Sequence, residues 1–234
     1  MATPTATPTP TSALDTPASC SEAIPRSAKR IKIAPSLSDE HHEMVTVILK
    51  SNDPDMPEKK YIIHKSIACY HSPVLDKAFN GPYTEGQTQV MTIEDFDRPD
   101  AFGAIQSWMY TQNTDGWKDE MGEEHDRKLY FVWILADRLI MPKLQNQVMN
   151  LLMDIRIFSL LWLGFIYKNT SPESKLRSFV SDRFATSINL RDKKTWLKAE
   201  VPVEFLLDLL FAQAWEVRPI PENMTAEGYH VVED

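Results

Sequence analysis

Residues 62–79 read IIHKSIACYHSPVLDKAF, and this stretch decides the fold. It opens on β-branched residues that are typical of a strand. The letters KSIACY then predict a helix, which must end near His71 because the residue before a proline disfavours helical backbone angles. Ser72 and Pro73 are a good N-cap and first-turn pair, so a second helix with the sequence PVLDKAF begins at once. The stretch therefore predicts a strand that runs into a pair of helices.

The same stretch contains His64, His71 and Cys69, which raises the question of a metal or catalytic site. On one continuous helix the two histidines would lie about 10 Å apart, whereas zinc ligands lie about 2 Å from the ion. We therefore interpret His64 as a strand-to-helix junction residue whose ring bonds nearby backbone, and Cys69 as a small buried hydrophobe. The triplet at residues 41–43, His-His-Glu, reads as solvated surface. The sequence nominates no metal ligand.

Further strands and helices are predicted on both sides of this stretch. The run MVTVILK starts at Met44, and together with YIIH it predicts a hairpin across the polar link SNDPDMPEKK. QVMTI is strand-like, and PDAFGAIQSWMYT predicts a helix with one buried face. RKLYFVWILADRLI is apolar nearly all round and predicts a helix buried on several sides, followed by the amphipathic MPKLQNQVMNLLMDI. The buried face of the PDAFGAIQSWMYT helix is predicted to comprise Phe102, Ile105, Met109 and Tyr110.

Three more helices are predicted at residues 157–169, 172–186 and 202–215. With these helices the folded unit is expected to run from about Glu43 to about Trp215. The last helix has an apolar side that comprises Val203, Leu206, Leu207, Leu210 and Ala214.

Both ends of the chain are predicted to be tails. Residues 1–40 are dominated by Thr, Pro, Ser and Ala and have too few large apolar side chains to offset the entropy of ordering, so we expect disorder. This tail contains one basic cluster, Lys29, Arg30 and Lys32, which is close to the short pattern that nuclear import receptors bind. Residues 216–234 are polar and acidic and are expected to form a C-terminal tail.

Composition narrows the class of protein. The chain has 234 residues, and its net charge of −8 argues against direct binding of nucleic acid, which usually needs a basic face. Two cysteines, Cys20 and Cys69, make no disulfide framework, and no signal segment opens the chain, so we expect an intracellular location, cytoplasmic or nuclear or both. The most apolar run, at residues 157–167, is shorter than the roughly 20 residues that span a bilayer, so no membrane segment is expected.

Residues 81–88, GPYTEGQT, have the glycine spacing of a phosphate-binding loop, but not its chemistry. Gln87 stands at the lysine position, Glu85 would repel phosphate, and the expected order of helix and strand is reversed. The patterns GxGxxG, GxSxG and HExxH are absent, and no nucleophile, base and orienting group are suitably spaced. We predict no catalytic residue and no cofactor, and an unrecognised enzyme is the remote alternative.

Residues 44–155 resemble the BTB/POZ domain. The resemblance is carried by MVTVIL, IIHKSIACYHSPVLDKAF, VMTIEDFDRPDAFGAIQSWMYT and LYFVWILADRLIMPKLQNQVM. It implies an α+β fold at residues 43–155, with a small three-stranded sheet capped by helices, followed by a helical extension at residues 156–215. This order is most similar to fungal proteins with a single BTB domain and a helical C-terminal extension. The central pattern comprises His64-Lys65, Ser72, Leu75, Phe79, Phe102, Tyr110-Thr111, Leu135-Ala136-Asp137 and Leu139.

The chain also departs from the family at informative positions. Many members begin with a helix that swaps between the subunits of a homodimer, and the Thr/Pro-rich tail offers no such helix. Met44 stands where members carry the acidic residue of a charged pocket, although Lys65 matches the basic one. Gln112 replaces the usual glycine after the Tyr-Thr pair. The resemblance leaves homo-oligomerisation open, but these departures argue against a swapped dimer and against a repressor-peptide groove.

The resemblance implies a non-enzymatic module that binds other proteins, as an adaptor or scaffold. Members that serve cullin-based ubiquitin ligases as substrate adaptors present a hydrophobic-x-Glu triplet in the loop before the third strand, and Tyr83-Thr84-Glu85 lies there. Tyr83 would fill a pocket of the cullin and Glu85 would accept a hydrogen bond. The alternative is that glutamate occurs there for local reasons. The alternative function is a nuclear transcriptional cofactor that uses the Lys29, Arg30 and Lys32 cluster.

Overall fold

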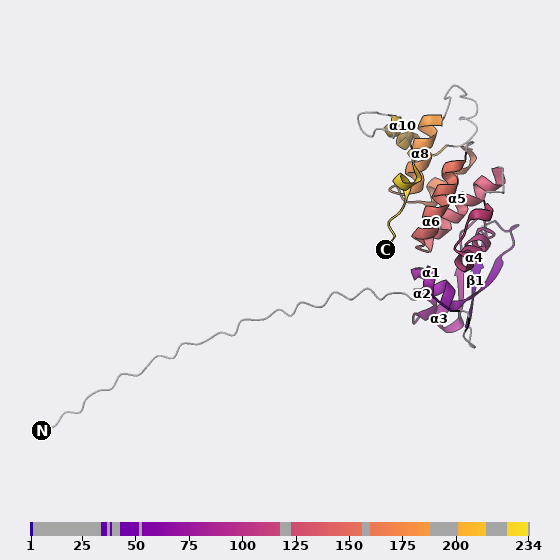
Figure 1. The fold of residues 1–234 in the computed structure, drawn as a ribbon, viewed down its shortest axis with the longest axis vertical. Coiled ribbons are helices and arrows are strands. Elements are labelled where there is room, and N and C mark those ends of the chain that lie inside the picture. The colour runs from indigo at the N-terminus through magenta and orange to yellow at the C-terminus, as the bar shows by residue number, and fades with distance from the viewer. Residues whose placement is uncertain are drawn as a thin grey trace. The chain divides into compact units, whose positions relative to one another are not determined.

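The computed structural model describes Met1 and residues 34–36, 38, 43–51, 53–117, 123–155, 160–187, 201–213 and 224–233. Apart from Met1, these residues belong to one compact unit, Ala34–Asp234 (Figure 1). Most of the tail predicted at residues 1–40 lies outside the described residues, and so does the basic cluster of Lys29, Arg30 and Lys32. The disorder of the tail therefore stays a prediction.

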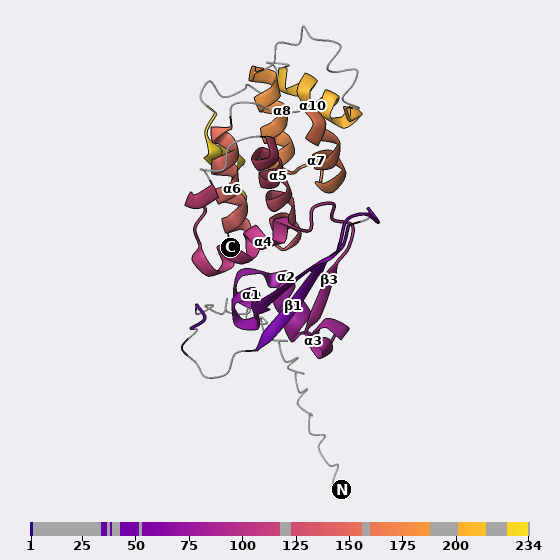
Figure 2. The same ribbon diagram turned by 90° about the vertical axis from the view of Figure 1, so that its right-hand side faces the viewer.

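Three short strands form the sheet that the resemblance implies. β1 (Met44–Leu49) lies in the middle, antiparallel to β2 (Lys59–His64) and parallel to β3 (Val90–Ile93). Every second residue of β1 from Val45 onward is buried, because successive side chains of a strand point to opposite faces. The predicted hairpin and third strand are confirmed, and Figure 2 shows β1 beside β3.

The helix pair follows directly from β2. α1 (Lys65–His71) and α2 (Pro73–Asn80) meet at Ser72, whose Oγ accepts a hydrogen bond from the backbone N–H of Leu75 at 3.2 Å. The predicted N-cap is therefore confirmed. The same hydroxyl donates to the backbone oxygen of Leu139 at 2.7 Å, so the cap also joins the helix pair to a distant part of the chain.

The remaining helices of the first half lie on either side of β3 in the sequence. A short helix, α3 (Thr84–Thr88), precedes β3, and α4 (Ala101–Thr111) follows it. After a 3₁₀ turn come α5 (Glu123–Arg138) and α6 (Pro142–Asp154), which pack against each other. All residues from Leu129 to Ala136 of α5 are buried, which confirms the prediction of a helix enclosed on several sides.

The second half of the unit is helical, as predicted. Its described elements are a 3₁₀ turn at Leu160–Trp162, α7 (Leu163–Asn169), α8 (Lys175–Ser187), α10 (Val203–Gln213) and a final 3₁₀ turn, η3 (Ala226–Tyr229). α10 packs on α8 and α7, and α7 packs on α5. The α+β fold with a helical extension is confirmed.

The buried face of α10 differs from the expected one. Phe205 lies inside, with its ring centroid 5.7 Å from that of Tyr167 and 5.3 Å from that of Phe184. Tyr167 also donates a hydrogen bond to Asp208 at 2.6 Å, and burial together with this bond raises the pKa of Tyr167. The expected face points outward because aromatic packing selects the other apolar side of the helix. Its exposed members are Val203, Leu206, Leu207 and Leu210, whereas Ala214 lies outside the described residues.

The end of the chain also differs from expectation. The folded unit was predicted to end near Trp215, yet residues 224–233 lie against α6 and α8, and Tyr229 is 3% exposed. A single aromatic anchors this acidic stretch, so composition alone gives no sign of its packing. In the part of the chain that the structure describes, no helix is long and apolar enough to span a membrane.

Candidate functional site

Residues 81–89, here called the α3 platform, contain the predicted cullin-binding pair. Tyr83 is the N-cap residue of α3, and its side chain is 53% exposed. Glu85 lies in the first turn of α3 and is partly exposed, rather than in a loop as expected. The backbone oxygen of Tyr83 accepts hydrogen bonds from the N–H groups of Gly86 at 3.1 Å and Gln87 at 3.3 Å. The structure thus places the aromatic ring and the carboxylate on one short helical turn.

Two glycines explain the sequence of the platform. A side chain at Gly86 would overlap the backbone oxygen of Gly81, and one at Gly81 would overlap that of Lys77 and press on the ring of Tyr83. The segment therefore folds back on itself so closely that only glycine fits at either position. The spacing that resembles a phosphate-binding loop has this steric cause.

Gln89 ties the platform to the rest of the domain. It ends α3 in the left-handed conformation with φ 57°, and its side-chain amide donates to the backbone oxygens of Phe79 at 3.2 Å and Gly86 at 2.5 Å. Its own backbone oxygen accepts from Thr46 of β1 at 3.0 Å. Because Phe79 is buried at the end of α2, the platform is attached to the core through backbone groups on both sides.

A charged pair lies where β1 and α1 begin. Lys65 Nζ is 3.0 Å from Glu43 Oε2, and the Lys65 N–H donates to the Glu43 backbone oxygen at 2.8 Å. Met44 stands at the family's acidic position, and the acid that pairs with Lys65 is Glu43, one residue earlier. The Glu43 side chain is largely exposed, so the ion pair itself contributes little to stability.

The histidines and the cysteine of the opening stretch have structural surroundings. The ring of His64 hydrogen-bonds the Tyr110 hydroxyl at 2.7 Å, a side-chain partner on α4 that the sequence did not predict. Tyr110 is correspondingly 38% exposed, so the predicted buried face of α4 is wrong at this residue. Cys69 is buried near the backbone oxygen of Leu75, as expected. Among the described residues, no three His, Cys, Asp or Glu side chains lie close enough to hold a metal ion.

Gln112 shows how the chain replaces the usual glycine after α4. Its φ of 55° is left-handed, a conformation that glycine adopts without strain. The side-chain amide lies 3.1 Å from His71 Nε2, and its oxygen accepts from Lys143 Nζ at 3.0 Å. These contacts, which sequence reasoning missed, offset the cost of the conformation and join α1, α4 and α6.

The outer face of the sheet is a second exposed surface that sequence reasoning missed. Ile62 and Val90 flank Thr46 on neighbouring strands, and Met44 lies two residues along β1 from Thr46 on the same face. All three apolar side chains are exposed. The alternation of the strands carried the signal, because it assigns every second residue to the face away from the core.

Comparison with known proteins identifies the family. The model of the BTB/POZ domain matches residues 36–155, so the chain belongs to the BTB/POZ domain family. No match is found among curated proteins. BTB/POZ domains are protein-interaction modules rather than enzymes, and they mediate binding to other proteins. The exposed surfaces described above are therefore candidate binding surfaces.

Proposed function

We propose that the protein is an adaptor whose α3 platform binds the cullin of a ubiquitin ligase. The observation that carries the proposal is the 53% exposure of Tyr83 on a backbone that is fixed on both sides. Glu85, two residues further, adds a partly exposed carboxylate in the first turn of the same helix. An aromatic residue and an acceptor at this place match the triplet of cullin-binding BTB proteins.

Rigid presentation favours Tyr83 as an interface anchor. A protein pays less entropy on binding when the contact residue is already held in its bound position. The contacts of Gly81, Gly86 and Gln89 leave the backbone around Tyr83 little freedom. Tyrosine is also among the residues that most often dominate the binding energy of an interface.

For the organisation of the chain, we propose a BTB unit at residues 43–155 and a helical extension at 156–215 that completes its core, with recruitment of a partner as the alternative role of the extension. Packing between the two supports this division. The ring of Phe165 of α7 packs against that of Phe131 of α5 at a tilt of 41°, with centroids 4.0 Å apart, and its centroid also lies 6.2 Å from that of Phe96. The extension thus shares aromatic contacts with the BTB unit.

The test is the affinity of the full-length chain for purified cullin, measured by titration calorimetry. Replacing both Tyr83 and Glu85 with alanine should weaken binding by about thirtyfold, because an anchor is worth about 2 kcal/mol and each factor of ten about 1.4 kcal/mol. Gln87→Ala is the matched control, since Gln87 is exposed on the same helix. It should change the affinity by less than about threefold.

Two results would contradict the proposal. One is a wild-type chain that shows no binding to cullin. The other is a double variant that loses binding only because it unfolds, which a thermal melt of the same sample would reveal.

A further inference from the structure

The C-terminal segment, Met224–Glu233, is attached to the helices in the manner of a bound peptide. Among residues 224–233, which the structure describes, Tyr229 is the one buried residue, whereas Val232 is 85% exposed. The segment lies against α6 and α8 (Figures 1 and 2). Only its central 3₁₀ turn is regular structure, and His230, directly after that turn, has extended backbone angles.

The segment is held first through its backbone. The side-chain amide of Asn146 on α6 pairs with both backbone groups of Val231: Oδ1 accepts from the N–H at 2.8 Å, and Nδ2 donates to the oxygen at 3.0 Å. Nδ2 also lies 2.8 Å from Glu233 Oε1. Asn146 is itself buried, so its amide is fixed in place. Backbone pairing of this kind binds extended peptides with little dependence on sequence.

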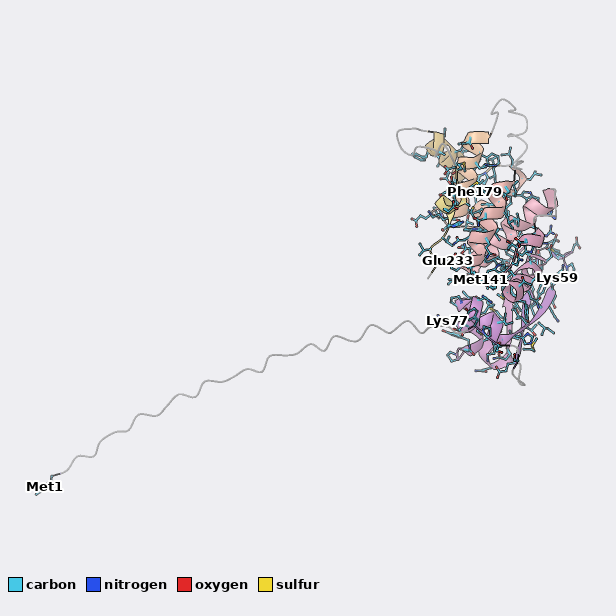
Figure 3. All side chains as sticks on the ribbon, viewed as in Figure 1. Met1, Lys59, Lys77, Met141, Phe179 and Glu233 are labelled. Carbon is cyan, nitrogen blue, oxygen red and sulfur yellow. The ribbon has the colours of Figure 1, made fainter. Side chains whose placement is uncertain are left out.

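The contacts of the Tyr229 side chain select for the residue type at this position of the segment. The hydroxyl donates to Asp182 Oδ2 at 2.8 Å, and the ring meets Phe179 edge to face with centroids 5.4 Å apart. Asp182 and Phe179 are both buried on α8, and Figure 3 labels Phe179 among the helices and Glu233 toward the end of the segment. A ring with a hydroxyl at its tip satisfies this site.

Further contacts hold the segment at the residues on either side of Tyr229. His230 Nε2 lies 2.8 Å from Asn150 Oδ1, one turn along α6 from Asn146. Lys175 Nζ, at the start of α8, donates to the Gly228 backbone oxygen at 3.4 Å. The contacts therefore extend over both sides of Tyr229.

We propose that the surface formed by Asn146, Asn150, Phe179 and Asp182, here called the α6/α8 surface, is a recognition site for an extended peptide of a partner protein. The peptide has the pattern Tyr-x-Val-x-Glu, and the chain's own C-terminal segment occupies the site in its absence. This proposal is independent of cullin binding.

The attachment is weak enough for exchange. Among the described contacts, one fully buried side chain, three partly buried ones and a few side-chain hydrogen bonds hold the segment, so we expect it to open locally without unfolding the helices beneath. Residues 214–223 connect it to α10, and a short connection gives an effective concentration on the order of millimolar. A partner peptide must overcome that concentration to displace the segment.

The experiment uses the full-length chain and a fluorescent peptide with the sequence of residues 224–233, MTAEGYHVVE. Tyr229→Ala removes the buried ring that anchors the chain's own C-terminal segment, and this should free the α6/α8 surface. In fluorescence anisotropy, this variant should bind the peptide at least about tenfold more tightly than the wild type does. Val232→Ala is the matched control and should behave as the wild type, because Val232 is exposed.

Two further variants locate the binding. Adding Asn146→Leu to Tyr229→Ala should abolish the gain, and a peptide with alanine in place of its tyrosine should bind at least about tenfold more weakly. Equal peptide binding by the wild type and Tyr229→Ala would overturn the proposal. So would a concentration-dependent dimer that Tyr229→Ala abolishes, because the segment would then exchange between copies.

A second measurement does not depend on the variant's folding. Amide hydrogen exchange on the wild-type chain should show the Val231 N–H exchanging at least about a hundredfold faster than the amides of α5, since local opening is easier than global unfolding. Exchange of Val231 only at the rate of global unfolding would overturn the proposal.

Discussion

Two short segments of this protein each contain a tyrosine, and they use it in opposite ways. The α3 platform has a backbone fixed by Gly81, Gly86 and Gln89, and it leaves the Tyr83 ring exposed. The C-terminal segment has only one 3₁₀ turn of regular structure, is held by side chains of α6 and α8 that bind its backbone at Val231 and Gly228, and buries the ring of Tyr229. In the α3 platform the backbone is fixed and the exposed Tyr83 ring is available to another protein. In the C-terminal segment the Tyr229 ring is already buried against the chain's own helices, where it anchors the segment.

The largest effect is expected beneath the α3 platform. Phe79→Ala should lower the free energy of unfolding by about 3–5 kcal/mol, because it removes a fully buried ring and leaves a cavity. Urea denaturation measures the loss. Lys77→Ala, exposed on the same helix, should stay within about 0.5 kcal/mol of the wild type. A small loss for Phe79→Ala would mean that the platform does not depend on the core.

The next effect tests the close approach of the two glycines. Gly86→Ala should cost about 1–3 kcal/mol, since its methyl group would overlap the backbone oxygen of Gly81 and force the segment apart. Gly116→Ala is the control, because a side chain there meets nothing within 4 Å. Thermal melts of both variants, with cullin affinity measured on the same samples, show whether fixing the backbone matters. Equal stability of the two variants would remove the steric argument.

A smaller effect is expected at the C-terminal segment. Tyr229→Phe keeps the ring but removes the donor to Asp182, which should cost about 1 kcal/mol. The loss is limited because the segment opens locally instead of straining the helices. Urea denaturation of the full-length chain measures it. A loss well above about 3 kcal/mol would show that the segment is an integral part of the core.

The smallest effect is expected at the exposed ring. Tyr83→Ala should change the free energy of unfolding by less than about 0.5 kcal/mol, because the side chain is half exposed and its backbone contacts remain. Differential scanning fluorimetry is sufficient to detect a departure. A marked loss of stability would mean that Tyr83 supports the fold rather than a partner.

The sequence predicted the parts of the fold that local patterns determine. The Ser72-Pro73 pair located the break between α1 and α2, and alternation in MVTVIL located β1 and its buried side. The face of α10 was not predictable in the same way. That helix has apolar residues on two sides, and the choice between them depends on the distant rings of Tyr167 and Phe184.

The candidate site was likewise predictable only in part. The resemblance led to Tyr83 and Glu85, but the reason for Gly81 and Gly86 appears only when the backbone is seen to close on itself. Tyr229 gave no signal, because a single aromatic in an acidic stretch has no periodicity.

Ser72 has a consequence for how the protein folds. Its hydroxyl completes two hydrogen bonds, one to a residue in the next turn and one across 67 positions of sequence to Leu139. The first forms as soon as α2 does. The second forms only after Leu139 has come close to Ser72, which has the entropic cost of closing the loop between them. The hydrogen bond that Ser72 accepts from Leu75 is thus expected to form early, with local structure, and the one that it donates to Leu139 is expected to form late. Interactions that form after the transition state act mainly on the unfolding rate. One hydroxyl therefore helps the helix pair to form and afterwards slows the loss of the assembled domain.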